Sequence, residues 1–170
     1  VVGIQIWRAA DARAKLNAAA EYEAAESLMR AGNAVGAYDA LQKLADERRG
    51  GMSDLAALRS AEMDLAAGNR DIAIQNLKKL KSDGRTRDFR DLAAVKLAAL
   101  IGDGMTPADF EKFMSDAASK NSPFYYSATL LIAEKYLAAG DENAARTWLD
   151  KILNDNNAPV SVATAAAALK

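Results

Sequence analysis

Cysteine and histidine are both absent from the 170 residues of this sequence. Without cysteine these residues form no disulfide and offer no thiolate to a metal or to catalysis, and the compartment is left open. Without histidine they lack the usual general base at neutral pH and the commonest metal ligand. Catalysis would have to rely on Asp, Glu, Lys, Ser or Tyr, and no pairing of these residues stands out. We therefore predict that the protein is not an enzyme and has no cofactor or metal site.

Proline, glycine and an excess of one charge are also lacking. The chain has three prolines and ten glycines, and alanine makes up much of its 51% hydrophobic fraction, which favours close-packed helices and predicts almost no strand. The 22 Lys+Arg against 23 Asp+Glu give a net charge of −1, so nothing draws the chain to nucleic acid or to an anionic membrane surface. The basic run at residues 85–90 alternates with aspartates and indicates a solvated loop and helix start.

A long apolar run and an intact signal peptide are missing as well. The first residues, VVGIQIW, are nevertheless apolar and are followed at once by Arg8. This pattern is typical of the last turns of a transmembrane helix, with Trp7 at the interface and a flanking cation. It is equally typical of a chain that begins inside an ordinary amphipathic helix. The residues leave both interpretations open, and we treat 1–8 as the candidate end of a truncated N-terminal membrane anchor.

What the sequence does contain is a repeat. Residues 61–80 read AEMDLAAGNRDIAIQNLKKL, residues 133–152 read AEKYLAAGDENAARTWLDKI 72 positions later, and residues 25–44 read AESLMRAGNAVGAYDALQKL 36 positions earlier. Each copy starts Ala-Glu and reaches a glycine, Gly32, Gly68 or Gly140, that is followed by Asn or Asp. Glycine after a helical run fits a C-terminal cap, and Asn or Asp then begins the next helix. Each copy therefore predicts helix, tight turn, helix.

The second helix of each copy has a regular buried face. A small residue stands five positions after the glycine, where a larger side chain would push the paired helices apart. An i, i+4, i+7 apolar stripe then starts from this alanine in every copy. The alanines are Ala37, Ala73 and Ala145, followed by Leu41, Leu77 and Leu149 and then by Leu44, Leu80 and Ile152.

A period of 36 predicts another turn glycine at position 104, where the sequence reads LAALIGDGMTPADFEKFMSDA. Gly104 stands there, and Gly102 is an additional break. Thr106 and Pro107 predict the N-cap and first residue of the following helix, whose apolar face includes Phe110. This copy lacks the Ala-Glu start and the turn alanine, so it is the degenerate repeat.

The pattern predicts an all-α fold: a right-handed superhelix of about four helical hairpins with a C-terminal capping helix. Each hairpin is too small to bury its apolar face alone, so stacking stabilises the array. We expect residues 9–170 to form a single repeat domain. Its hairpins span about 9–48, 53–82, 88–119 and 123–155, and its cap spans 159–170.

These hairpins resemble tetratricopeptide repeats, whose usual period is about 34 residues. The resemblance covers nearly the whole chain and rests on the turn glycines and on alanines at fixed positions. The first-helix alanines are Ala25, Ala61 and Ala133; Tyr136 matches the family's first-helix aromatic. The family's early tryptophan is missing and the period is two residues longer, so the chain is a divergent relative.

More narrowly, Gly3 and Trp7 at the end of an apolar segment, the Ala-rich first helix and the Pro159 turn resemble the YfgM-type family. Members of that family are bacterial inner-membrane proteins with one N-terminal anchor and a periplasmic repeat domain, associated with the Sec translocon and with periplasmic chaperones. The resemblance implies a single anchor upstream of Val1, a periplasmic location, and a translocon component or chaperone as partner. A cytoplasmic location is the alternative.

In tetratricopeptide arrays the first helix of each hairpin, helix A, lines the concave face that receives peptides. The register places nine candidate partner-binding residues there: Tyr22, Glu26, Met29, Leu58, Glu62, Leu65, Leu130, Glu134 and Leu137. The recurring glutamates form an acidic row flanked by apolar side chains, interrupted by Ala98. Such a surface suits an apolar or mildly basic segment. The competing interpretation is that the glutamates are ordinary solvated residues and the leucines belong to the core between repeats.

Two classes of function follow. The first is a non-catalytic protein–protein interaction scaffold, membrane-tethered in the periplasm, that assists protein translocation or chaperone recruitment. The second is an assembly adaptor, cytosolic or periplasmic, that homodimerises through its first helix or its alanine-rich last helix and uses no peptide groove.

Overall fold

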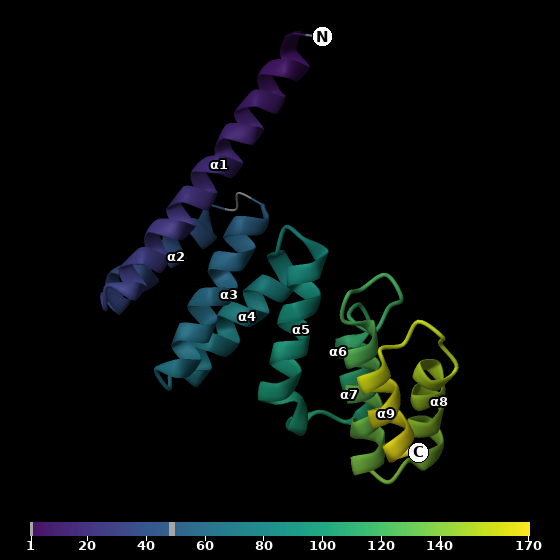
Figure 1. Ribbon diagram of the computed structural model, residues 1–170. Helices are drawn as coiled ribbons and strands as arrows, with labels where there is room; N and C mark the ends of the chain where they lie inside the picture. Colours follow the sequence, from purple (N-terminus) through teal and green to yellow (C-terminus); the bar gives the residue numbers. More distant parts are fainter. Residues whose placement is uncertain (1, 48–49) are drawn as a thin grey trace. The chain divides into compact units, whose positions relative to one another are not determined.

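The computed structural model describes residues 2–47 and 50–170, with the side chains of residues 2–7 and 9 excepted. Its elements follow one another as helices joined by short turns, and no strand occurs in the described ranges (Figure 1). The all-α repeat fold predicted from the sequence is confirmed. The elements are α1 (Val2–Arg30), α2 (Ala34–Asp46), α3 (Gly51–Ala66), α4 (Arg70–Asp83), α5 (Arg87–Ile101), the short 3-10 helix η1 (Gly102–Gly104), α6 (Pro107–Met114), α7 (Tyr125–Ala138), α8 (Glu142–Leu153) and α9 (Val160–Leu169).

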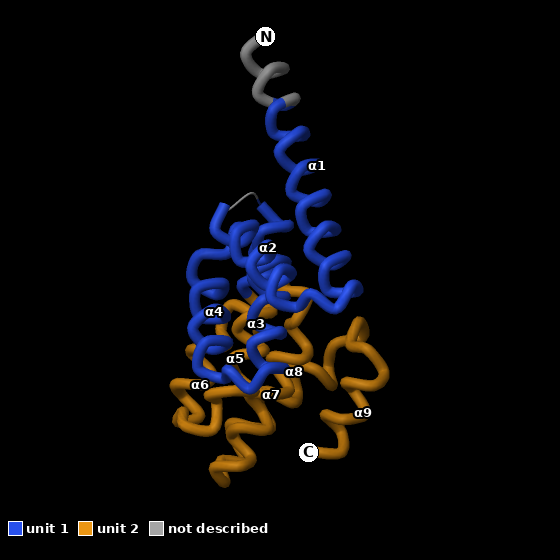
Figure 2. The backbone as a smooth tube through the Cα atoms, turned by 90° about the vertical axis from the view of Figure 1, so that its left-hand side faces the viewer, with its two compact units in different colours: residues 1–90 blue, residues 91–170 orange. Residues whose placement is uncertain are grey.

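The chain divides into two compact units, residues 1–90 and residues 91–170 (Figure 2). In unit 1, α1 packs against α2 and α3, α2 packs against α3, and α3 packs against α4. In unit 2, α6 packs against α7 and α7 against α8, and α9 packs against both α7 and α8. Consecutive helices therefore pack on their neighbours, as they do in a solenoid of helical hairpins.

The three predicted turn glycines end helices α1, α3 and α7 in the left-handed conformation. Their φ angles are 79° at Gly32, 81° at Gly68 and 79° at Gly140. The residue after each glycine donates its backbone N–H to a carbonyl five positions back, at 2.9 Å for Asn33, 2.8 Å for Asn69 and 3.0 Å for Asp141. These hydrogen bonds satisfy carbonyl groups at the helix end. They require the left-handed backbone conformation, which a residue with a Cβ atom adopts only with strain. The prediction of glycine turns is confirmed in these three hairpins.

The third hairpin turns differently from the expectation placed on Gly104. Gly104 does not adopt a positive φ, and the reversal is made by η1. The Phe110 ring lies so close to Gly102 that a Cβ there would be 2.6 Å from Cε2 of the ring. Glycine is therefore required at position 102 for close packing. Thr106 caps α6 as predicted, its Oγ1 accepting from the N–H of Asp109 at 3.2 Å.

Helix α6 is shorter than predicted, because it ends at Met114 and not near 119. The following residues, SDAASKNS, form turns. Serine, aspartate and asparagine hydrogen-bond to nearby backbone and so favour turns over continued helix. The apolar face of α6 is thus carried by little more than two turns, with Phe110 and Met114 as its buried residues.

Alanines lie at the contacts between paired helices. Ala25, Ala61 and Ala133 on the first helices and Ala37, Ala73 and Ala145 on the second are all fully buried. The leucines four residues after the second set, Leu41, Leu77 and Leu149, are each 1% exposed. The register read from the sequence therefore describes the core.

Polar side chains connect neighbouring hairpins with related geometry in each unit. In unit 1, the Tyr38 hydroxyl on α2 donates to Asp64 on α3 at 3.2 Å, and Asn76 on α4 donates to the same carboxylate at 2.9 Å. In unit 2, the hydroxyl of Tyr136 on α7 donates to Glu111 on α6 at 2.7 Å. This hydrogen bond, together with burial, raises the pKa of Tyr136 to about 12.

The buried alanines give a direct test of the helix register. Replacing Ala73 or Ala145 with leucine forces extra volume into a contact between two backbones, and we expect a loss of about 1–3 kcal/mol in the free energy of unfolding. Thermal and denaturant unfolding measure this loss. Ala66→Leu on the exposed end of α3 is the matched control and should change stability by less than about 0.5 kcal/mol. Equal stability of the buried and exposed variants would contradict the register.

Candidate functional site

In unit 1 the first helices α1 and α3 pack side by side and bring charged residues together. Arg59 on α3 places its Nε 3.0 Å from Oε1 of Glu26 on α1 and its guanidinium 3.7 Å from Oε2 of Glu62. The three side chains are between 21% and 36% exposed. Two glutamates of the predicted acidic row therefore converge on one arginine. With Tyr22, these residues are called the unit 1 cluster.

Tyr22 joins this cluster to the core beneath it. Its ring packs, partly buried, against a group of buried residues that includes Ala25 and Leu41. Burial raises the pKa of its hydroxyl, and the nearby Glu26 carboxylate, with which it shares a hydrogen bond, raises it further. Tyr22 thus presents a fixed hydroxyl beside the ion pair, with its ring anchored.

Arg59 lies outside the predicted set, because the predicted binding face comprises only the positions three before, one after and four after each first-helix alanine. Arg59 lies two residues before Ala61. Because α1 and α3 pack side by side, Arg59 contacts Glu26, the residue that follows Ala25 in the previous hairpin. An Arg facing a Glu across successive repeats was the signal that could have identified it.

The other predicted partner-binding residues have mixed surroundings. Met29 and Leu65 are half-buried, and Leu58 is only 6% exposed. Leu130 packs on a core group that includes Ala166 of α9, and Leu137 borders a hollow with Leu169. Glu134 is exposed. The structure therefore brings Tyr22, Glu26 and Glu62 together in unit 1, and the binding role of the nine residues stays a prediction.

Unit 2 has a hollow of about 270 Å³ bordered by α5, α6 and α7. Lys135 lies at its edge and donates to the carbonyl oxygens of Gly102 at 2.9 Å and Asp103 at 3.3 Å. Its ammonium is 5.9 Å from the centre of the Phe110 ring. The lining is mostly apolar with charged residues among it: Ala98, Ala99, Gly102, Asp103, Phe110, Leu131, Glu134, Lys135 and Ala138.

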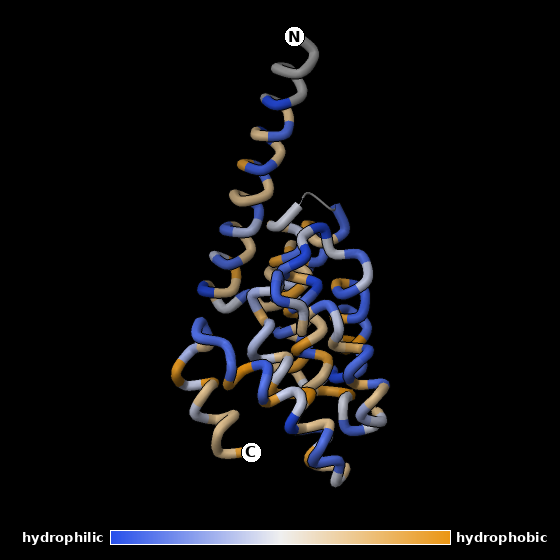
Figure 3. Tube along the Cα trace, turned by 90° about the vertical axis from the view of Figure 1, so that its right-hand side faces the viewer, coloured by the Kyte–Doolittle hydropathy of each residue, from blue (hydrophilic) through white to orange (hydrophobic). Residues whose placement is uncertain are grey.

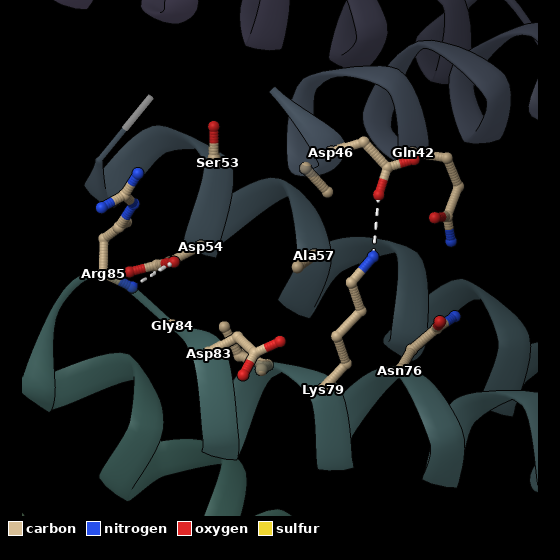
Figure 4. A pocket seen from close by; sticks show the side chains of 12 residues that line it. Gln42, Asp46, Ser53, Asp54, Ala57, Asn76, Lys79, Asp83, Gly84 and Arg85 are labelled. Carbon is tan, nitrogen blue, oxygen red and sulfur yellow. Dashed lines mark hydrogen bonds and ion pairs between the residues drawn. The ribbon is translucent and has the colours of Figure 1, made fainter. Parts of the chain in front are cut away.

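Unit 1 has a more polar hollow of about 180 Å³, bordered by α2, α3 and α4 (Figure 4). Lys79 points across it to Asp46, at 2.9 Å. Asp54, only 4% exposed, accepts from the backbone N–H groups of Arg85 at 2.9 Å and Thr86 at 2.7 Å, and from the Thr86 hydroxyl at 3.0 Å. The buried carboxylate therefore holds the turn that leads into α5, which is a structural role.

Comparison with protein families gives one result. Residues 1–109 match the family model described as tetratricopeptide repeat-like domain, which is more than half of the chain. The chain belongs to this family. No curated protein and no solved structure matches the sequence. Tetratricopeptide-like domains generally mediate protein–protein interaction and are generally non-catalytic, and a protein-interaction scaffold is the class of function that this membership supports.

Within the residues that the structure describes, no group of three or more acidic side chains is arranged to hold a metal ion. No helix in that part of the repeat-domain protein is both long and apolar enough to cross a membrane. The predicted anchor at residues 1–8 depends on Val1 and on the side chains of residues 2–7, which lie outside the described part.

The ion pair in the unit 1 cluster is testable by a double-mutant cycle. Glu26→Gln and Arg59→Met should show a coupling of about 0.2–1 kcal/mol in the free energy of unfolding, because the pair is close but partly solvated. Denaturant unfolding at low salt measures the coupling. The same cycle with Glu23→Gln, an exposed α1 glutamate paired elsewhere with Arg30 at 4.0 Å, should show none. Equal coupling in both cycles would remove Arg59 from the description of the site.

Proposed function

We propose that this protein is an adaptor that docks a segment of a protein partner on the first helices of its hairpins. The observation that carries the proposal is the unit 1 cluster, in which an anchored tyrosine, an arginine and two glutamates share one partly exposed face. Tyrosine and arginine are enriched where protein interfaces concentrate their binding energy. Side chains already held by neighbours lose little further conformational entropy when a partner binds.

The charges on this face favour an apolar or mildly basic segment over an acidic one. In the unit 1 cluster Glu26 and Glu62 outnumber Arg59, and in unit 2 the first helix α7 separately carries the exposed Glu134. Carboxylates at the edge of an interface select the charge and orientation of the partner and influence the association rate more than the affinity.

We further propose that a membrane anchor holds the domain at the periplasmic face of a bacterial inner membrane, where it assists protein translocation or chaperone recruitment. The support is the apolar start with Gly3 and Trp7 and the resemblance to YfgM-type proteins. The helix α1 continues without interruption from this start into hairpin 1. Residues 8 and 10–17 are mostly exposed, and polar and apolar residues alternate along this part of α1 (Figure 3). At 1.5 Å per residue, this stretch is a spacer of about 15 Å.

Charge reversal on the first helices tests the docking proposal. We expect the triple variant Glu26→Lys, Glu62→Lys, Glu134→Lys to reduce partner capture in cells, measured by proximity labelling from the tethered protein, and to change the salt dependence of capture by the purified protein. Circular dichroism checks that the variant is folded, because Glu26 and Glu62 also hold Arg59.

The matched control makes the same change of charge on exposed second-helix positions, with Asp39→Lys, Asp71→Lys and Glu142→Lys. It should capture the partner as the unmodified protein does. Equal capture by both triple variants, or loss only in the control, would move the docking surface away from the first helices.

A homo-oligomerising assembly adaptor is the second candidate, favoured by large apolar side chains exposed on α1 and α9. Leu16 is 71% exposed and Val160 is 83% exposed. Under this function the mass in solution rises with protein concentration, and Leu16→Glu restores the monomer. Sedimentation equilibrium measures both. A concentration-independent monomer mass would exclude this candidate.

A further inference from the structure

In both units the residues at the same repeat positions lie where successive first helices meet, but their side chains differ. In unit 1, Glu26 of α1 faces Arg59 of α3, and Glu62 lies one turn further along α3. The equivalent residues in unit 2 lie 72 positions later in the sequence. They are Ala98 for Glu26, Leu131 for Arg59 and Glu134 for Glu62. The glutamate is kept, while its arginine and the facing glutamate are replaced by apolar residues.

This replacement coincides with an open space. Ala98, Leu131 and Glu134 all line the 270 Å³ hollow of unit 2. A water molecule occupies about 30 Å³ in the liquid, so the hollow has room for a long side chain. Phe110 and Ala138 contribute further apolar lining. In unit 1 the chain fills the corresponding place with its own arginine.

The charges around the hollow favour a cation. Glu134 is exposed, and no ion pair or hydrogen bond of its carboxylate is found within the described ranges. Asp103 adds a second carboxylate to the lining. Lys135 is the opposing charge, and its ammonium is already engaged by the carbonyl oxygens of Gly102 and Asp103. The acidic side chains therefore exceed the basic one, and Glu134 has lost the partner that Glu62 has.

We propose that this hollow receives an arginine side chain from the protein partner, in the place that Arg59 takes in unit 1. The aliphatic stem lies against Ala98 and Leu131, and the guanidinium pairs with the Glu134 carboxylate. Arginine fits better than lysine because its guanidinium is more weakly hydrated and can donate two N–H groups to one carboxylate. The inference rests on the proposed scaffold function and specifies the partner's side chain.

The test uses ¹⁵N-labelled full-length protein and two small probes, N-acetyl-arginine methylamide and its neutral counterpart with citrulline. We expect the arginine probe to shift the amide signals of residues 98–103 and 131–138, and the citrulline probe to leave them unchanged. Glu134→Gln should weaken arginine binding about threefold, as expected for a partly solvated ion pair. Glu62→Gln is the matched control and should leave the binding in unit 2 unchanged.

A second variant keeps the test independent of Glu134. Leu131→Arg supplies the arginine from the chain itself, as Arg59 does in unit 1, and should abolish the shifts caused by the probe while circular dichroism shows a folded protein. Equal shifts with citrulline, no shift with arginine up to the limit of its solubility, or unchanged binding by Glu134→Gln would each overturn the arginine site.

Partner capture separates this inference from the proposed function. Loss of capture in the triple first-helix variant, without arginine binding in unit 2, would leave the scaffold standing and remove the arginine site. Capture that does not depend on the first helices would remove both the docking surface and the use of this hollow by a partner, even where the free arginine probe binds.

Discussion

The structure depends on the close approach of the two helices in each hairpin. Fully buried alanines occupy the contact in three hairpins, with Ala25 and Ala37 as the first pair. Such short side chains let the helices pack at close distance, and the leucine stripe that follows can then fill the space on one side. The approach also demands a tight reversal of the chain, which the left-handed glycine provides. The alanine contact and the glycine turn are therefore both needed for the same close approach of two helices, which explains why they recur together.

The third hairpin shows what happens when this constraint is relaxed. Leu97 and Asp109 stand where the other hairpins have their two alanines. The chain there reverses through the 3-10 helix η1, and the Phe110 ring closes on Gly102. The second helix of this hairpin is also the shortest of the second helices, ending at Met114. The division between the two compact units falls at residue 90, just inside the helix that opens this hairpin.

The sequence was sufficient for those features that one residue type determines. The turns at Gly32, Gly68 and Gly140, the alanine contacts and the Thr106 cap each follow from local chemistry and agree with the sequence prediction, whereas the turn expected at Gly104 does not. The sequence was insufficient where two distant segments decide the outcome. Phe110 excludes a side chain at Gly102 only because the chain folds back, and Arg59 joins Glu26 only because α1 and α3 lie side by side. A row of glutamates therefore looked uncompensated when read along a single register.

The positions proposed for partner recognition are not those of the alanine contact, so they can change without disturbing the core. The alanine contact uses Ala25, Ala61 and Ala133, while the groove uses the residues two before and one after them. Position 59 is arginine and the equivalent position 131 is leucine, yet the alanines two residues later, Ala61 and Ala133, are equally buried. In unit 1 the arginine pairs with two glutamates, while in unit 2 alanine and leucine border a hollow that has Glu134 in its lining. The two hairpin junctions therefore differ in their surface chemistry, and under the proposed function each presents a different one to a partner.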